Sequence, residues 1–303
     1  MKKNKMTLAA AVVVTAVFFG CQNPDSGSNS GGGLTLPAAV NPGKVQNFEG
    51  TAVADKDEAL ELLEAMGEIG FFEVLRDAKS TAFDAAFTAA YGKSFDDFYD
   101  ELDGKTSYSV SIKIADSDEL KDAANAVTAG SVTAATIKGT FKAAVSSSVP
   151  FGSSAVPVVG DTMSLSTSSD LTYDISGGFY TEEVSGTTYK IAGVITVQVE
   201  QGYQSAYKAE ETAIADEKYT GDISATVKMT ATLSISDGTK GGKFSASIAR
   251  GQNQQLRTVG EKYEMFTSDV EVYDNTGKKI ITLDSYFNGL PDIMPYVAML
   301  LGI

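Results

Sequence analysis

The chain has 303 residues, a formal net charge of −15, no histidine, no tryptophan and a single cysteine, Cys21. Without histidine, Ser-His-Asp and Cys-His nucleophiles and imidazole metal sites are excluded. The acidic balance also argues against nucleic-acid partners, whose binding depends on Lys and Arg that neutralise phosphates. With 43% hydrophobic and 9% aromatic residues, the composition is that of a globular protein.

The first 20 residues have the features of an export signal. Three lysines give a positively charged start, and residues 8–19 form an apolar run interrupted only by Thr15. This run is too short to span a bilayer, which takes about 20 apolar residues. A charged start, a short apolar run and a small residue before a cut site are typical of a secretory signal. The small residue is Gly20, so the expected cut lies between Gly20 and Cys21.

Val17-Phe18-Phe19-Gly20-Cys21 resembles the lipobox of bacterial lipoproteins, in a relaxed form similar to that of spirochaetes. In that family the cysteine thiol receives a diacylglyceryl group, the signal is removed, and the cysteine becomes the acylated N-terminus. The family usually has Leu where Phe18 stands. The resemblance covers about 20 residues and implies lipid attachment at Cys21 and a place in the bacterial cell envelope. Gln22 after the cysteine favours the outer membrane, with the periplasmic or surface side left open.

Removal of the signal would leave 21 basic and 39 acidic residues, a net charge of −18. Such a surface repels anionic headgroups, so we expect the membrane contact to be the N-terminal lipid anchor. Acylation of Cys21 would leave no thiol for a disulfide or a metal. We expect no catalytic, cofactor-binding or metal-binding residues, and hence no cofactor.

The mature chain divides into a tether and one folded domain. Residues 21–44 contain a Gly/Ser-rich stretch and several prolines, a composition typical of flexible linkers. Residues 45–303 form a single α+β domain, with a helical part at 55–103 and a β-rich part at 104–303. A first short strand is expected over residues 44–53.

The helical block 55–103 carries clear end signals. Asp55 followed by Glu58 matches a capping-box variant, and Gly92 is suited to end the second helix. Ser94 is expected to cap a third short helix. Asp96 and Asp97 fall in its first turn, where the helix dipole favours acidic residues.

From residue 105 the hydrophobic period changes from 3.6 to 2, interrupted by a short helix at about 118–127. The longest alternating run is residues 223–235, and an Asp-Gly turn signal follows at 237–242. Val270 and Val272 are expected to pair with Ile281 and Leu283 across a hairpin turn. One polar and one apolar face per strand indicates an antiparallel sheet buried on one side.

These patterns predict about eight to ten strands in a large curved antiparallel sheet or an open β-barrel. The 55–103 helices and a C-terminal apolar helix within residues 290–303 should pack on it, because a sheet must cover its apolar face. The similarity between residues 138–141 and 192–195 is too slight to indicate a repeat.

Acidic residues cluster at positions 96–103 and again at 116–122, and oxygen ligands suit calcium. The spacing of an EF-hand loop is absent, so the interpretation is a solvated, capped helix and no metal. Paired carboxylates serve glycoside hydrolysis, but no spacing selects a pair, and we expect no enzyme activity.

Two functions remain open. The first is a non-catalytic binding module for an apolar or lipid-like ligand, held between the curved sheet and the helices. The second is a surface-exposed structural or adhesion lipoprotein that contacts a partner protein through its Ser/Thr-rich strands.

Overall fold

The computed structural model describes residues 37–38, 41–127, 132–153, 158–184, 186–207, 219–256, 262–267 and 270–283. The helices in these ranges are η1 (Pro42–Lys44), α2 (Lys56–Glu68), α3 (Phe71–Tyr91), α4 (Phe95–Asp100) and α5 (Glu119–Val127). The strands are β1 (Thr51–Ala52), β2 (Ser107–Ser117), β3 (Thr136–Ser147), β4 (Thr162–Asp174), β5 (Phe179–Val184), β6 (Thr187–Tyr207), β7 (Tyr219–Ser236), β8 (Lys240–Leu256), β9 (Lys262–Thr267), β10 (Val270–Tyr273) and β11 (Lys279–Leu283).

All eleven strands form one sheet, in the order β11-β10-β8-β7-β6-β4-β3-β2, with β1 and β9 paired to β8 and β5 paired to β6. Strands adjacent in the chain are mostly adjacent in the sheet, and their pairing is antiparallel except for the short β1–β8 contact. Among the described residues the sheet does not close on itself, since β2 and β11 stand at opposite ends of the order. The expected large antiparallel sheet is confirmed, and in the described residues it is not closed into a barrel.

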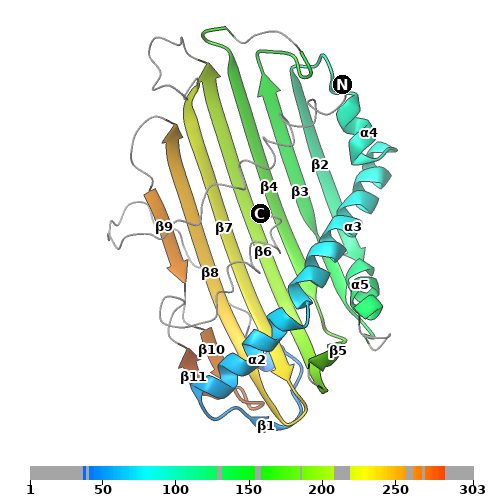
Figure 1. Cartoon of the computed structure of the whole chain (residues 1–303), viewed down its shortest axis with the longest axis vertical. Helices are drawn as coiled ribbons and strands as arrows, with labels where there is room; N and C mark the ends of the chain where they lie inside the picture. The colour runs from blue at the N-terminus through cyan, green and yellow to red at the C-terminus, as the bar shows by residue number, and fades with distance from the viewer. Residues whose placement is uncertain are drawn as a thin grey trace.

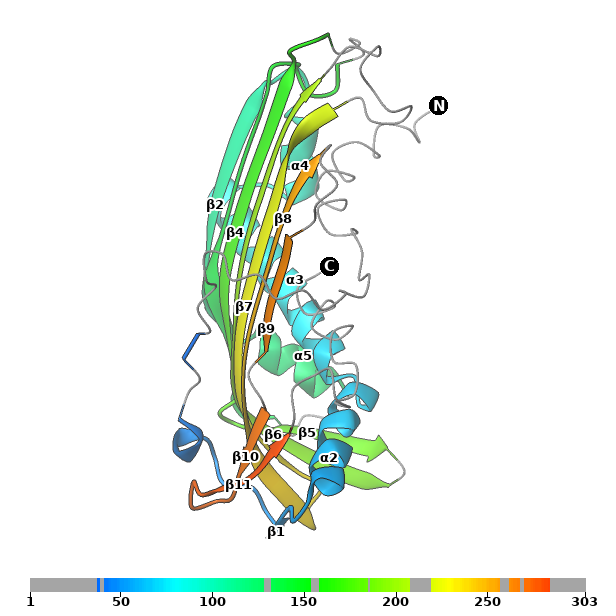
Figure 2. The same cartoon turned by 90° about the vertical axis from the view of Figure 1, so that its left-hand side faces the viewer.

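The sheet has one apolar and one polar face because side chains alternate along every strand. Val110, Phe141 and Val197 lie on the apolar face, and α2, α3 and α5 run across it (Figures 1 and 2). Ser111 and Lys142 lie on the opposite, polar face. The predicted alternation therefore sorts these residues correctly between core and surface.

The core forms where the helices meet the sheet. Leu75 and Ala78 of α3 and Ile137 and Ile191 of the sheet are each fully buried in one continuous cluster. At roughly 25 cal/mol per Å² of buried apolar area, such a layer is the main stabilising contribution. Tyr173 is also fully buried here, and its hydroxyl has no hydrogen-bond partner among the described residues. Burial raises the pKa of Tyr173 well above its usual range.

The helix ends follow the predicted capping. The Asp55 carboxylate accepts from the Glu58 backbone N–H at 3.0 Å, and Glu58 accepts in return from the Ala54 N–H at 2.8 Å. Gly92 ends α3 with φ 72°, a left-handed conformation that favours glycine. Ser94 caps α4 by accepting from the Asp97 N–H at 3.1 Å. The helices expected within residues 55–103 and at 118–127 are confirmed.

An aromatic cluster joins the end of α3 to β2 and β3. Phe87 is fully buried, and its ring lies within 5.5 Å, centroid to centroid, of the rings of Tyr91, Phe95 and Phe98. Edge-to-face and offset arrangements of this kind add to the stabilisation from burial. The cluster fixes the end of α3 beside β2, the edge strand.

Two strand glycines allow neighbouring backbones to approach closely. Gly139 lies opposite Leu171, and Gly193 lies opposite Leu233. A Cβ at Gly139 would lie 2.0 Å from the Asp170 carbonyl oxygen, and one at Gly193 would lie 2.1 Å from that of Thr232. The slight similarity of the two segments thus corresponds to the same local role.

Residues 41–50, here called the strap, lie on the polar side of the sheet before the chain reaches α2. Figure 2 shows η1 on the side opposite α2, α3 and α5. The strand expected over residues 44–53 is mostly wrong, because only Thr51 and Ala52 pair with β8. The signal, most of the tether and the C-terminal segment 290–303 lie outside the described residues.

Candidate functional site: a polar trough across the sheet

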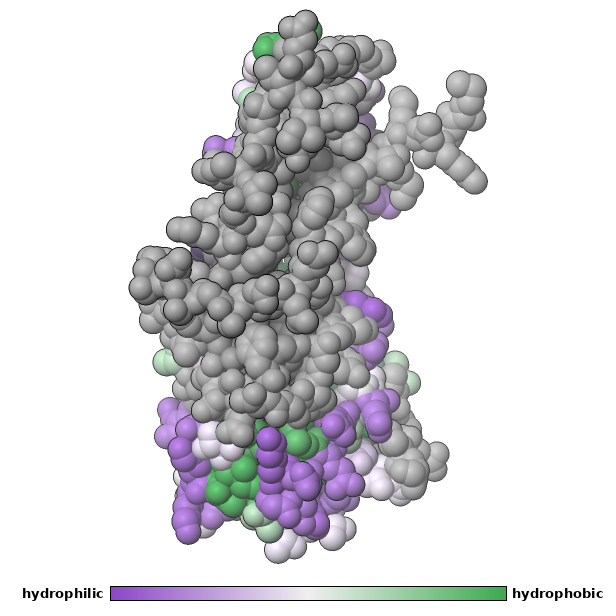
Figure 3. Space-filling view, turned by 60° about the vertical axis from the view of Figure 1, so that its left-hand side comes forward, coloured by the Kyte–Doolittle hydropathy of each residue, from purple (hydrophilic) through white to green (hydrophobic). Residues whose placement is uncertain are grey.

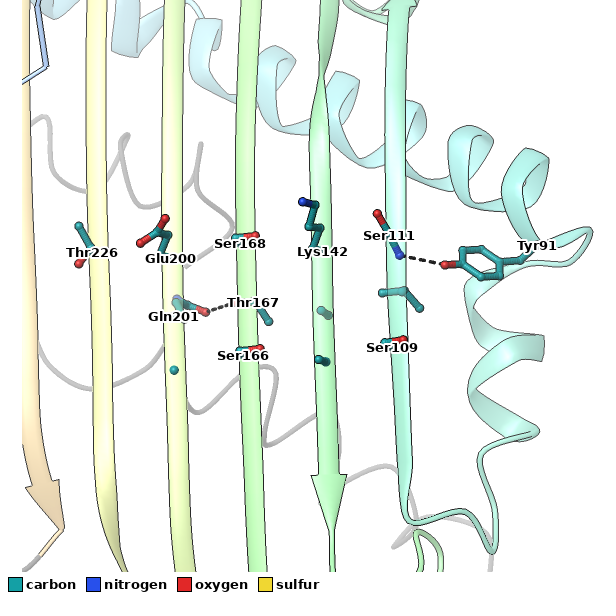
Figure 4. A pocket seen from close by; sticks show the side chains of 14 residues that line it. Tyr91, Ser109, Ser111, Lys142, Ser166, Thr167, Ser168, Glu200, Gln201 and Thr226 are labelled. Carbon is teal, nitrogen blue, oxygen red and sulfur yellow. Dashed lines mark hydrogen bonds between the residues drawn. The ribbon is translucent and has the colours of Figure 1, made fainter.

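Five polar side chains form a row across the polar face, one from each of five neighbouring strands. The register pairs Ser111 with Lys142, Lys142 with Ser168, Ser168 with Glu200, and Glu200 with Thr226. Figure 4 shows these five residues at about the same level of β2, β3, β4, β6 and β7. Because neighbouring strands lie about 4.8 Å apart, the row is about 19 Å long.

The row lies in a shallow, open trough of about 700 Å³. Ser109 of β2 and Ser166 of β4 add a second line of hydroxyls, and Gly202 opens space beside Ser166. Tyr91 bounds the trough at the edge of the sheet (Figure 4). On the opposite face, turned toward the helices, the Thr167 hydroxyl donates to the side-chain oxygen of Gln201 at 3.3 Å.

Lys142 and Glu200 carry opposite charges two strands apart, and both are exposed. Neither forms an ion pair within the described part of the chain. Other lysines of the domain behave differently: Lys93 pairs with Glu101 at 2.6 Å and Lys138 with Asp116 at 3.3 Å. The charges of the trough are therefore available to a ligand.

The next row along the strands repeats this mixture of charges. Lys113 and Asp170 both lie opposite Thr140, and Gln198 donates to the Asp170 carboxylate at 3.3 Å. Lys228 lies opposite Gln198. Positive and negative groups thus alternate on a face that otherwise carries hydroxyls, although the chain as a whole has a net charge of −15.

This arrangement suits non-covalent recognition. Hydroxyls of Ser and Thr both donate and accept hydrogen bonds. Charges of both signs at fixed spacing select a partner with complementary charges more than they add affinity. With Lys142 and Glu200 about 10 Å apart by strand spacing, the trough can orient a polar partner that has an acid and a base at that separation.

Large exposed hydrophobic side chains in the described ranges are few: Val158, Val159 and Ile280. Figure 3 shows a small hydrophobic area bounded by hydrophilic residues at the lower end of the molecule, where Figure 1 places α2, β10 and β11. Isolated residues of this kind are normal on a protein surface. The polar face is the more extended candidate for binding.

The acidic residues singled out from the sequence do not assemble into a site. Asp97 accepts at 2.7 Å from the hydroxyl of Ser94, the N-cap of α4, while Asp118 pairs with Lys121 at 2.9 Å. Across the ranges that the structure describes, no three acidic residues are placed to hold a metal ion. Likewise, no described helix is long and apolar enough to cross a membrane. Cys21 falls outside the described residues.

The trough was not predicted. The alternation of polar and apolar residues indicates a polar face on each strand, but not which residues of different strands lie side by side. What the sequence lacks is the register that brings Lys142 between Ser111 and Ser168. Comparison with protein-family models, with curated proteins and with solved structures finds no match for this chain.

Proposed function

We propose that this chain is a lipid-anchored protein of the bacterial envelope, attached through Cys21, whose folded domain is a non-catalytic binding module. Its partner is a protein that contacts the polar trough. The observation that carries the proposal is a row on one face of the sheet, made of Ser111, Lys142, Ser168, Glu200 and Thr226. Its two charged side chains are exposed and form no ion pair in the described residues.

The composition supports a binding role without covalent chemistry. The sequence has no histidine, and its one thiol is assigned to the anchor. The hydroxyls of the trough come from strands, which hold their side chains at fixed spacing and so favour recognition of a complementary surface. Gln22, which follows the cysteine, favours a location at the outer membrane.

The anchor is tested by metabolic labelling of cells with palmitate. Wild-type protein should incorporate label, and a Cys21→Ser variant should lose both the label and signal cleavage at that site. A wild-type protein without label would contradict the proposed lipid anchor at Cys21. Protease treatment of intact cells then separates the surface from the periplasmic side, because a periplasmic protein is digested only after lysis.

The trough is tested by exchanging its two charges. A Lys142→Glu/Glu200→Lys variant keeps the net charge but reverses the pattern, so a partner recognised through these charges should bind at least about tenfold more weakly. The measurement is affinity for envelope proteins that bind the immobilised wild-type domain. Lys105→Glu/Glu64→Lys is the matched control on exposed positions elsewhere, and it should bind as the wild type does.

If the control and the trough variant bind equally well, the partner contacts another surface of the domain. A failure of both would indicate a general effect of charge exchange. Loss in the trough variant alone supports the proposal, provided that its unfolding midpoint matches that of the control.

A second candidate is an apolar or lipid-like ligand on the other face. Ile112, Phe141, Val199 and Val227 lie at one level of the strands on the face turned toward the helices. Ile112 and Phe141 lie under α3, but Val199 and Val227 remain only partly buried. This stretch of partly covered apolar surface is the observation that favours it.

That candidate is tested by organic extraction of the purified protein followed by mass spectrometry. A lipid recovered in a fixed molar ratio, and lost in a Val199→Asp variant, would support it. Recovery of no apolar molecule from protein isolated under native conditions would count against it.

A further inference from the structure

The polar face is covered at one end, although it is open at the trough. Two neighbouring strands carry a ladder of polar residues that are each less than 7% exposed: Thr230, Thr232, Ser234 and Ser236 on β7 and Lys243, Ser245 and Ser247 on β8. Their register pairs Ser234 with Lys243 and Thr232 with Ser245. Polar groups are buried at a cost unless partners are supplied, so the cover over this ladder requires an explanation.

The strap lies on this face and contacts the sheet through specific groups. The side-chain amide of Asn275 donates to the Phe48 carbonyl at 3.0 Å, and its oxygen accepts from the Phe48 N–H at 3.1 Å. The Asn275 side chain therefore forms hydrogen bonds with both main-chain groups of Phe48. The geometry depends on the peptide backbone at that position and on no particular side chain.

Two side chains of the strap have their own receptors on the sheet. The Phe48 ring lies over Gly241, where an added Cβ would come within 2.5 Å of the ring. The Glu49 carboxylate pairs with Lys190 at 2.6 Å, and the Glu49 carbonyl accepts from the Ser236 hydroxyl at 2.7 Å. Together these contacts specify an aromatic residue followed by an acidic one in an extended segment.

Lys243 is a further feature of the covered ladder. It is 1% exposed and lies two residues beyond Gly241 on the same face. Burial lowers the pKa of Lys243, and the neighbouring Asp274 carboxylate opposes that shift. A buried cation of this kind is less costly once exposed to water or paired with an acid.

We propose that the strap occupies a peptide-binding site as an intramolecular ligand, and that the site accepts an extended peptide with an aromatic–acidic pair from another protein when the strap is released. Gly241 provides the aromatic subsite, Lys190 the acidic subsite, and Asn275 with Ser236 the main-chain contacts. The site is distinct from the trough, and it does not depend on the function proposed for the trough.

The test uses the full chain and a fluorescent peptide with the sequence of residues 41–52. A Phe48→Ala/Glu49→Lys variant removes both side chains of the internal ligand while leaving every residue of the site in place. The peptide should bind this variant at least about tenfold more tightly than the wild type, whose site is occupied. A peptide with the same two changes should not bind.

Amine labelling of Lys243, followed by mass spectrometry, reports whether the strap has opened. Labelling relative to the exposed Lys113 should be low in the wild type, should rise in the variant, and should fall again when the unchanged peptide is added. A Lys243 that stays protected in the variant would overturn the proposal, because the strap would not depend on those contacts. An opened strap with no peptide binding would also overturn it, as would equal binding of both peptides.

Discussion

The hydroxyl of Tyr91, at the end of α3, accepts a hydrogen bond of 2.9 Å from the backbone N–H of Ser111, on the outer edge of β2. An edge strand exposes main-chain groups that can pair with another chain, and proteins commonly cover such edges. Here Tyr91, which the aromatic cluster holds in place, accepts the hydrogen bond of one such group, the Ser111 N–H. Because Ser111 also lines the trough, the same contact fixes the end of the candidate site.

Removal of the Tyr91 hydroxyl should destabilise the edge strand β2. A Tyr91→Phe variant retains the ring but leaves the Ser111 N–H without its partner, so we expect the free energy of unfolding to fall by about 1 kcal/mol. Urea unfolding measures the loss, and light scattering should show more self-association at high concentration. Tyr99→Phe is the control, since the Tyr99 hydroxyl contacts no backbone group of β2 in the described residues. Equal behaviour of both variants would contradict a protective role.

The close approach of strands at Gly193 predicts a large effect for a small change. Gly193→Ala would place a methyl group 2.1 Å from the Thr232 carbonyl oxygen, at a residue with φ 145°. The strands must separate to admit it, and we expect a loss of about 2 to 4 kcal/mol in urea unfolding. Thr140→Ala, at an exposed strand position, should change stability by less than about 0.5 kcal/mol. A Gly193→Ala variant as stable as this control would show that the backbones can part freely.

Stability should depend on pH through Lys79 of α3. Burial, with the charge of Arg76 as a smaller cause, lowers the pKa of Lys79 to about 8. The unfolded chain, with a lysine pKa near 10.4, then binds more protons between about pH 8 and 10.4, so this group makes stability rise with pH across that window. Its contribution is at most about 3 kcal/mol.

Urea unfolding of the wild type and of Lys79→Met at pH 7 and pH 9.5 isolates this contribution. The difference in stability between the two proteins should narrow as the pH rises, with Lys79→Met the more stable at pH 7. Lys105→Met, at an exposed position, should show no such change. A constant difference between wild type and Lys79→Met would contradict the lowered pKa.

The capping box of α2 provides a smaller and local prediction. Asp55→Ala removes the acceptor for the Glu58 N–H and should cost about 1 kcal/mol in urea unfolding. Asp57→Ala removes an acid from the same first turn without removing a cap. The loss should therefore be clearly larger for Asp55, and equal losses would assign the effect to the helix dipole alone.

Local signals predicted the parts of the fold that depend on neighbours in the chain. The hairpin that pairs Val270 with Leu283 and Val272 with Ile281 has the expected register, because a short turn fixes it. The caps at Asp55 and Ser94 are likewise determined within four residues. Where a signal spans only a few residues, side-chain chemistry and period are sufficient.

Features that join distant segments were not predicted. The middle of β4, residues 166–170, has Ser, Thr or Asp on both faces, so this stretch has no hydrophobic alternation to reveal a strand. The position of the strap depends on Asn275, which is 227 residues away from Phe48. The trough depends on five strands in register, and no single strand contains that information.

The order of strands in the sheet has a kinetic consequence. From β2 to β8, each long strand is paired with the next long strand of the chain, so the pairing is local in sequence and the entropy of loop closure is small. Assembly can therefore propagate one strand at a time, faster than in β proteins whose neighbours are distant in sequence. Thr51 is different, because it bonds to Thr239 across 188 residues of chain. The N-terminal segment consequently cannot dock until β8 is in place.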